Sequence, residues 1–315
     1  MVCVPLFMII SGYLYVGKVI PISKVTMITH LSKLWHVVFT YLIMGVLAFL
    51  FRKFYLYEEV SFFKDCILSI LRYDKYSWYI NMYIGMFLLI PFLNILWHGI
   101  PNKDPRRCLV VVLVVLTVLP SILNVYNLTD TEYLLKPWLT SSYSQVVPDW
   151  WTNLYPLTYY YIGAYLKDEV DIKACNTTRL VFLLLGAVVV FGLYNIYRSY
   201  SVSFIKGPWC HHWGSFQNMA MSILVFLIIN SVTYPTWLRN AKLIPQISAL
   251  TFGAYLMSWI PDNVFYPMLN EQVGKTQLRF NYFPVMVVLV AVSALLLSWI
   301  ADRITKTVQR VFRKA

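Results

Sequence analysis

Two adjacent histidines are the residues whose type best suits acid–base chemistry. His211 and His212 occur in the segment GPWCHHWGSF, between Trp209 and Trp213. Because an imidazole titrates near neutral pH, either ring could remove a proton from a hydroxyl group. Neighbouring side chains point in different directions, so we expect at most one of the two to take part. The alternative is more common for such residues: a histidine pair that lies at the membrane–water interface beside tryptophans.

One carboxylate occurs in strongly apolar surroundings. Asp262 belongs to the segment MSWIPDNVFYP, which follows an apolar run that begins at Ile247. An ionisable group in an apolar helix is costly to place there, so it is a functional hypothesis by default. Asp262 could orient a base or bind a substrate hydroxyl, or it could extend to water at the end of its helix. We therefore predict a catalytic set made of Asp262, His211 and His212.

Hydroxyl and amide side chains collect just after the histidine pair. Ser215, Gln217, Asn218 and Ser222 could line a polar pocket at the start of an apolar stretch. Three consecutive tyrosines, at 159–161, point in three directions from a helix, so one or two could line a cavity while the others pack. Hydrogen bonds between helices are the alternative for both groups.

Helices that cross a membrane must position these residues. The 315 residues are 59% hydrophobic and 13% charged, with a mean hydropathy of +0.62, whereas soluble domains are about 25% charged. This composition excludes an ordinary soluble fold. Continuously apolar runs of about 20 residues fit helices rather than the alternating strands of a barrel. We predict one all-α integral-membrane domain over 1–315, with about nine spans near 2–17, 34–51, 78–98, 108–126, 151–167, 179–198, 215–233, 247–266 and 282–301.

Lysine and arginine are unevenly distributed between the loops. One set of loops and the C-terminal tail hold most of them, and the opposite loops hold most of the acids. The cation-rich side is therefore expected to face the cytoplasm, together with the C-terminus. The net charge of +12 reflects this topology and attraction to anionic lipid rather than nucleic-acid binding. We expect no metal site, because there is no CxxC spacing among the cysteines, which are Cys3, Cys66, Cys108, Cys175 and Cys210.

Four segments carry a resemblance to a known family. They are VPLFMIISGYLY from Val4, WYINMYIGMFLLIPFLN from Trp78, YPLTYYYIGAYLK from Tyr155 and ISALTFGAYLMSWIPDNVFYP from Ile247. Each segment alone is a weak signal. In this order and at this spacing they resemble the acyltransferase 3 family of bacterial membrane proteins, over nearly the whole chain.

The resemblance implies ten transmembrane helices in the bacterial plasma membrane, with both termini in the cytoplasm. An odd number of spans ending inside places Met1 outside, so we expect the chain to lack the family's first helix. The best-attested catalytic residues of the family, an Arg and a His, lie on that helix. Many members also carry a His in a late YLxH motif, where this chain has Ser258.

The resemblance also implies a reaction. Family members move an acyl group, commonly acetyl, from a cytoplasmic thioester such as acetyl-CoA to a hydroxyl of a surface polysaccharide or lipid-linked glycan. The expected partners are therefore membrane lipids and a glycan. We expect the phosphates of acyl-CoA to bind Lys18, His30 and Lys33, although the positive-inside bias alone also explains the lysines. We expect the glycan to contact Ser11, Trp78, Tyr79, Tyr160, Ser215 and Ser258.

Two other functions stay open. A transporter or flippase for a lipid-linked sugar would favour inverted repeats and broken helices in paired positions, and the sequence shows no such symmetry. A catalytically inactive truncated homologue would follow from loss of the family's first helix.

Overall fold

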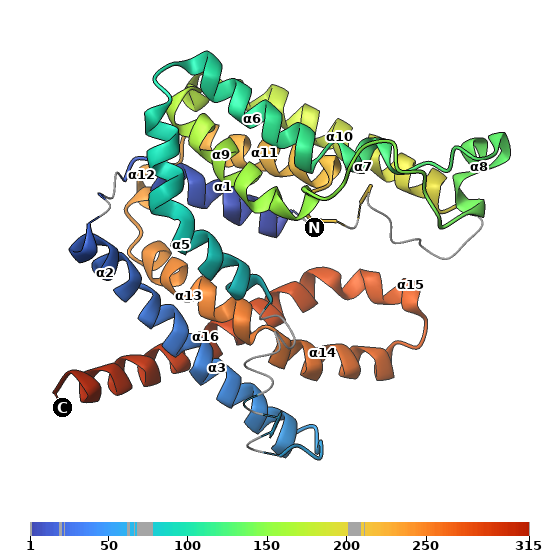
Figure 1. Ribbon diagram of the computed structural model, residues 1–315. Helices are drawn as coiled ribbons and strands as arrows, with labels where there is room; N and C mark the ends of the chain where they lie inside the picture. The colour runs from blue at the N-terminus through green and yellow to red at the C-terminus, as the bar shows by residue number, and fades with distance from the viewer. Residues whose placement is uncertain are drawn as a thin grey trace. The chain divides into compact units, whose positions relative to one another are not determined.

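Helices account for all regular secondary structure in the part of the chain that the structure describes (Figure 1). The structure is a computed structural model, and it describes residues 2–18, 21, 23–61, 64–65, 67, 78–200, 209–210 and 212–314. The prediction of an all-α protein is confirmed for these residues. The helices are α1 (Cys3–Tyr15), α2 (Lys24–Ser32), α3 (Leu34–Phe54), α5 (Trp78–Gly99), α6 (Lys103–Thr117), α7 (Pro120–Leu123), α8 (Thr131–Leu135), α9 (Tyr155–Asp168), α10 (Thr177–Arg198), α11 (Phe216–Ser231), α12 (Thr236–Arg239), α13 (Leu243–Met257), α14 (Trp259–Gln272), α15 (Thr276–Arg279) and α16 (Phe283–Lys314).

The chain forms two compact units. The first consists of Met1–Pro21 with Met86–Tyr234, and the second of Ile22–Gly85 with Pro235–Ala315. Helix α5 begins in the second unit and ends in the first. The single integral domain expected over 1–315 stays a prediction.

The first unit is built around α9. Helix α1 packs on α9 and α11, α6 packs on α9, and α10 packs on α11 (Figure 1). Two glycines permit the closest of these contacts. A Cβ on Gly12 would overlap the backbone carbonyl of Tyr160, and a Cβ on Gly163 would overlap the backbone carbonyl of Ile9. The backbones of α1 and α9 therefore touch directly, which is how small residues pack membrane helices.

Side-chain caps fix the starts of several helices. Asn176 accepts a hydrogen bond from the N–H of Arg179 at the start of α10. Ser23 and Thr26 form a reciprocal capping box at the start of α2. These contacts satisfy N–H groups that a helix cannot pair internally. The bounds of α2 and α10 therefore follow from local sequence.

In the second unit, α16 packs on α3, α13 and α14. Its small core is formed by Met44, Met257 and Ala301. The span predicted over 247–266 is not one continuous helix, because α13 and α14 are separate helices bent by 63° that pass as a span only together. Pro261 gives the reason: a proline ring clashes with the carbonyl four residues earlier, at Met257, where α13 ends.

The prediction of about nine spans is not confirmed. Within the described residues, four helical segments are long and apolar enough to cross a membrane, or five if the bent pair counts as one: Lys24–Phe54, Tyr79–Gly99, Thr177–Arg198, Thr276–Thr307 and α13 with α14. Helices α1, α6, α9 and α11 have 13 to 16 residues. At about 1.5 Å per residue they fall short of a hydrocarbon core of about 30 Å.

Helix α10 shows the character of a lipid-facing helix most clearly. None of its apolar window is buried inside the protein. Phe182 is 69% exposed and Leu193 is 62% exposed. Side chains of this kind are stable outside a protein core only where lipid covers them.

Candidate functional site

A polar cavity lies in the first unit, beside the segment that contains His212. Its volume is about 450 Å³, within the usual range for small-molecule sites. Nine of its ten lining residues carry a hydroxyl, amide, carboxylate or imidazole group, so it offers hydrogen-bond partners to a ligand that carries hydroxyl groups. The lining residues are Thr117, Pro120, Ser121, Asn124, Tyr143, Ser144, Gln145, Asp149, Thr152 and His212.

Asn124 fixes one wall of this cavity. The residue follows α7, and its amide nitrogen donates to the carbonyl of Val147 at 2.7 Å. Its side-chain oxygen accepts from the N–H groups of Val146 and Val147 at 2.9 and 3.0 Å. These three bonds supply the partners that an irregular segment cannot obtain from secondary structure. Asn124 thereby holds the segment that leads to Asp149.

Two hydroxyl contacts join the helices around the cavity. Ser121 donates to the carbonyl of Val118 at 2.7 Å and accepts from the N–H of Phe216, the first residue of α11, at 3.0 Å. The hydroxyl groups of Thr117 and Thr158 bond to each other at 2.8 Å and link α6 to α9. These contacts set how α6, α7, α9 and α11 meet at the cavity.

The loop that carries His212 is held by α9 and α11. The amide nitrogen of Asn218 donates to the carbonyls of His212 at 3.0 Å and Cys210 at 3.4 Å. The hydroxyl of Tyr159 donates to the carbonyl of Trp213 at 2.8 Å. Asn218 and Tyr159 are both buried. Two residues that the sequence placed near a possible pocket therefore position the histidine loop.

One backbone contact defines the proton position on His212. The N–H of Gly214 donates to Nδ1 at 3.1 Å, and the ring packs edge-on against Tyr155 with 5.5 Å between centroids. Because Nδ1 accepts this bond, the proton of the neutral imidazole lies on Nε2. An Nε2–H group suits donation to a sugar oxygen or to a negatively charged oxygen better than it suits proton removal.

Asp149 supplies a carboxylate to the cavity. Its Oδ1 accepts from the amide nitrogen of Gln145 at 2.9 Å. Its backbone carbonyl accepts from the N–H and the hydroxyl of Thr152 at 3.1 and 2.8 Å. An exposed carboxylate can accept hydrogen bonds from sugar hydroxyls and can take up a proton. The cavity therefore combines an acceptor, Asp149, with a donor, His212.

Two predicted glycan-binding residues of the first unit have structural contacts. Tyr160 is buried, and its hydroxyl donates to the side-chain oxygen of Asn94 at 2.6 Å. Asn94 in turn donates to the carbonyls of Tyr15, the last residue of α1, and Lys18, just beyond it, at 2.8 and 2.9 Å. Ser215 is buried and caps α11. Their contact with a glycan stays a prediction.

The remaining predicted residues of the first unit are Ser11, Lys18 and His211. Ser11 donates to a carbonyl one turn earlier in α1 at 2.9 Å. Lys18 is exposed, with its ammonium group 4.6 Å from the ring centroid of Tyr15. His211 lies outside the described residues, so only His212 of the pair has a described position.

The second unit contains the rest of the predicted catalytic set. Asp262 lies in the first turn of α14, and its N–H donates to the carbonyl of Ser258 at 3.1 Å. The Ser258 hydroxyl donates to the carbonyl of Tyr255 at 2.8 Å. A carboxylate in the first turn of a helix is favoured by the helix dipole. Because Asp262 and His212 belong to different units, neither unit contains the whole predicted set.

The other predicted residues of the second unit lie on α5, on α2 and directly after α2. Tyr79 is 6% exposed and packs edge-on against Tyr255 at 5.5 Å between centroids. Trp78 begins α5, and its side chain lies outside those described. His30 is buried in α2, and Lys33 is exposed between α2 and α3. The residues expected to bind CoA phosphates are thus divided between the two units.

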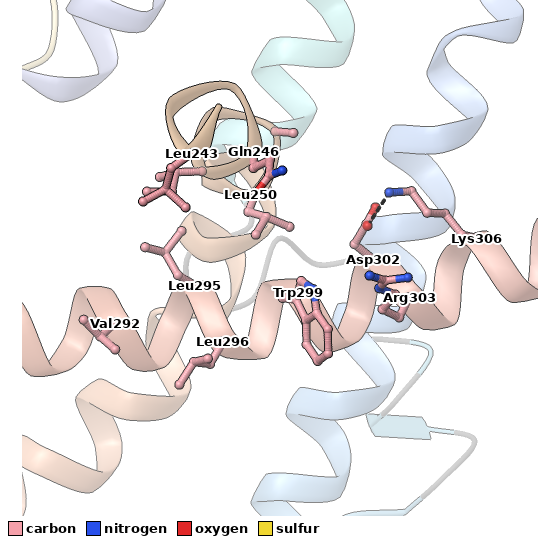
Figure 2. A pocket seen from close by; sticks show the side chains of 12 residues that line it. Leu243, Gln246, Leu250, Val292, Leu295, Leu296, Trp299, Asp302, Arg303 and Lys306 are labelled. Carbon is pink, nitrogen blue, oxygen red and sulfur yellow. Dashed lines mark hydrogen bonds and ion pairs between the residues drawn. The ribbon is translucent and has the colours of Figure 1, made fainter. Parts of the chain in front are cut away.

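A second cavity, of about 930 Å³, lies in the second unit between α13 and α16 (Figure 2). Leucine and valine side chains form much of its wall, and charged side chains lie at one end. There Asp302 pairs with Lys306 at 2.5 Å, and the guanidinium of Arg303 lies 5.3 Å from the ring of Trp299. An apolar wall with charges at one end matches a lipid better than a hydroxyl-rich ligand. We therefore take the polar cavity of the first unit as the candidate acceptor site.

Similarity to known proteins decides the family. The sequence pattern of the acyltransferase domain family, acyltransferase 3, matches residues 1–303. The chain belongs to the acyltransferase 3 family. This match confirms the resemblance and includes every residue that lines the polar cavity. No curated protein and no solved structure matches the chain.

This family consists of membrane-embedded transferases, in agreement with the apolar helices of the chain. Of the residues that line the cavity, sequence singled out only His212; Asn124, Tyr143 and Asp149 are among those that it missed. No motif marks them, and Asp149 resembles the other acids of its loops. The abundance of Ser, Thr and Tyr between 127 and 149 is the one signal that could have indicated a sugar-binding wall.

Proposed function

We propose that this protein transfers an acyl group, acetyl in the first instance, from acyl-CoA to a hydroxyl of a cell-surface polysaccharide or lipid-linked glycan. Family membership supports the acyl transfer. The observation that carries the proposal is the polar cavity, where the Asp149 carboxylate and the His212 N–H group lie among hydroxyl and amide side chains. A cavity of this composition fits a sugar.

The reaction makes specific demands on the site. The sugar oxygen attacks the thioester carbonyl carbon, the C–S bond breaks, and the hydroxyl proton ends on the thiol of CoA. A base must accept that proton as the C–O bond forms, and a donor must stabilise the negative oxygen of the tetrahedral intermediate. We assign the first role to Asp149 and donation to a sugar oxygen or to the oxyanion to His212. Asp262 and His211 are retained as further proposed catalytic groups.

The donor is placed at the cytoplasmic side, where the cation-rich loops are expected. Lys18 and Lys33 are both exposed, so their ammonium groups are available to phosphates of CoA. His30 is buried in α2, so its proposed contribution is to the position of that helix. The proposed orientation has the C-terminus in the cytoplasm of a bacterial cell.

One observation favours a second candidate function, transport of a lipid-linked sugar. Helices α13 and α14 are bent by 63° at Ser258, and broken helices form the substrate site of many transporters. Such transporters contain a matching broken helix in a second repeat. Among the described residues there is one such bent pair, so acyl transfer is the better supported proposal.

The test is the O-acetyl content of surface polysaccharide in a strain that lacks the gene. The strain is complemented with the unmodified chain, with Asp149→Asn, with Asp262→Asn or with Glu132→Gln. Glu132 is the matched control, because it is an exposed carboxylate of the same region that pairs with Lys136 on its own short helix. Equal amounts of each variant in the membrane are verified by immunoblotting.

We expect the unmodified chain and Glu132→Gln to restore O-acetylation. Asp149→Asn should reduce it about a hundredfold or more if the carboxylate is the base. If Asp149→Asn restored O-acetylation fully, the cavity would not be the catalytic site. If Asp262→Asn restored it fully, Asp262 would not be a catalytic group. Absence of O-acetyl groups with the unmodified chain present in the membrane would contradict the proposed function itself.

A further inference from the structure

An arginine at the end of α10 is buried without a hydrogen-bond partner. Arg198 is 0% exposed, and its Nε, Nη1 and Nη2 atoms make no hydrogen bond. No ion pair among the residues that the structure describes includes Arg198. A guanidinium group stays charged at physiological pH. Burying an isolated charge is costly, so Arg198 requires a negatively charged counterpart.

Three aromatic rings enclose this guanidinium. Its central carbon lies 4.3 Å from the ring centroid of Trp209, 4.9 Å from Tyr126 and 5.5 Å from Tyr143. Cation–π attraction offsets part of the cost of burial. The ring faces do not replace the hydrogen bonds that the N–H groups of the guanidinium require. The aromatic cage therefore holds the cation in place but leaves its donors unused.

Further unused donors belong to the same group of residues. Trp209 Nε1, the Tyr143 hydroxyl and Ser199 Oγ are also buried without a hydrogen-bond partner. The indole nitrogen can only donate. Burial raises the pKa of the Tyr143 hydroxyl, and both the charge of Arg198 and its hydrogen-bonding group beside this hydroxyl offset the rise only in part, so the hydroxyl stays protonated at neutral pH. We call Arg198, Ser199, Tyr143 and Trp209 the Arg198 cluster.

The composition of the Arg198 cluster matches an oxyanion. A carboxylate or phosphate accepts several hydrogen bonds at once, and the fork of an arginine binds either one with two parallel bonds. A water molecule accepts fewer bonds and leaves the charge of Arg198 uncompensated. The cluster therefore fits an anionic group better than solvent.

Tyr143 connects the Arg198 cluster to the polar cavity. It packs edge-on against Trp209 with 5.6 Å between centroids, and it also lines the cavity together with Asp149 and His212. We propose that the Arg198 cluster binds a carboxylate or phosphate group carried by the ligand of the polar cavity, so that the acceptor is an acidic glycan. That the ligand is a glycan rests on the proposed function.

The test measures binding to the purified full chain in detergent, without an acyl donor. The probes are glucuronate, glucose 1-phosphate, glucose and inorganic phosphate. The readouts are the apparent Tm and the calorimetric Kd. The variants are Arg198→Met and Arg198→Lys, with Lys136→Met as the control, because Lys136 is an exposed cation that pairs with Glu132.

We expect glucuronate or glucose 1-phosphate to raise the Tm of the unmodified chain more than glucose does. A response to only one of them identifies the anion as a carboxylate or a phosphate. Arg198→Met and Arg198→Lys should weaken this binding about tenfold or more, because charge-assisted bonds of the fork are lost. The ligand-free Tm of Arg198→Met should equal or exceed that of the unmodified chain, because an uncompensated buried charge is gone.

Other results would overturn the inference. If neither acidic sugar changes the Tm, or if Arg198→Met lowers the ligand-free Tm and Arg198→Lys restores it, Arg198 is a structural cation of the aromatic cage. If inorganic phosphate binds as tightly as glucose 1-phosphate, the anion site is not part of a glycan site. O-acetylation in cells without anion binding refutes this inference alone, whereas anion binding without O-acetylation refutes the proposed function.

Discussion

The contact between α1 and α9 makes a quantitative prediction about two glycines. An alanine Cβ at position 12 would lie 2.8 Å from the carbonyl carbon of Tyr160, and one at position 163 would lie 2.8 Å from the backbone nitrogen of Tyr13. Ordinary van der Waals contact begins at 3.4 Å. Because the opposing atoms belong to backbone, they cannot rotate aside. The carbonyl oxygens of Tyr160 and Ile9 lie closer still, so the two helices must separate by more than an ångström.

Overpacking of this kind costs about 1 to 3 kcal/mol, against a gain of about 1 kcal/mol when alanine replaces glycine in a helix. We expect each of Gly12→Ala and Gly163→Ala to lower the free energy of unfolding by about 2 kcal/mol, at the upper end of that balance because backbone must move. For a chain of 315 residues, with an unfolding entropy of about 2.1 cal/mol/K per residue, the loss corresponds to a Tm lower by roughly 3 °C.

The assay is thermal unfolding of the purified variants in detergent, at one fixed scan rate because membrane proteins often unfold irreversibly. Gly186→Ala and Gly192→Ala in α10 are matched controls, since an added Cβ there meets nothing within 4 Å. Their Tm should be unchanged or slightly raised. If Gly12→Ala and Gly163→Ala behaved like these controls, α1 and α9 would not be in backbone contact, and the reasoning would fail.

Two further predictions concern the residues that hold the first unit together. Gly214→Ala would place a Cβ 3.1 Å from Nδ1 of His212. O-acetylation in the polysaccharide assay should therefore fall about tenfold or more, while the Tm changes little. Unchanged O-acetylation would show that His212 is not part of the site. Asn94→Ala would lose two bonds to backbone carbonyls and strand the Tyr160 hydroxyl, so it should cost about 2 to 4 kcal/mol by thermal unfolding. Tyr160→Phe should cost less, and the double variant should cost less than the sum of the two; strict additivity would contradict a shared network.

The amino-acid sequence by itself determined the class of this protein. Continuous apolar runs cannot be solvated by water, and a lipid core forces backbone groups to pair within a helix. This reasoning holds for α10, because none of its apolar window is buried inside the protein. It also sufficed for the family, because the four segments from Val4 to Pro267 are local patterns that need no knowledge of contacts.

The number of spans could not be read from hydropathy, because an apolar run can be covered by protein as well as by lipid. Helix α9 has 14 residues and is mostly buried between its neighbours. Pro261 breaks the apolar run that begins at Ile247, through a clash with a carbonyl one turn earlier. An apolar run covered by protein and one covered by lipid have the same hydropathy, and only packing distinguishes these two situations.

The candidate site was decided by tertiary structure. Sequence indicated His212, but the proposal that it donates a proton depends on the N–H of Gly214 at Nδ1. Asp149 joins it only because Asn124 holds the segment 146–147 through three long-range bonds. Arg198 reads in the sequence as a cation at the end of a helix, where positive charge is ordinarily favoured by the dipole. Its burial among rings from three separate segments exists only in the folded chain, because nothing in a linear sequence specifies which distant side chains will meet.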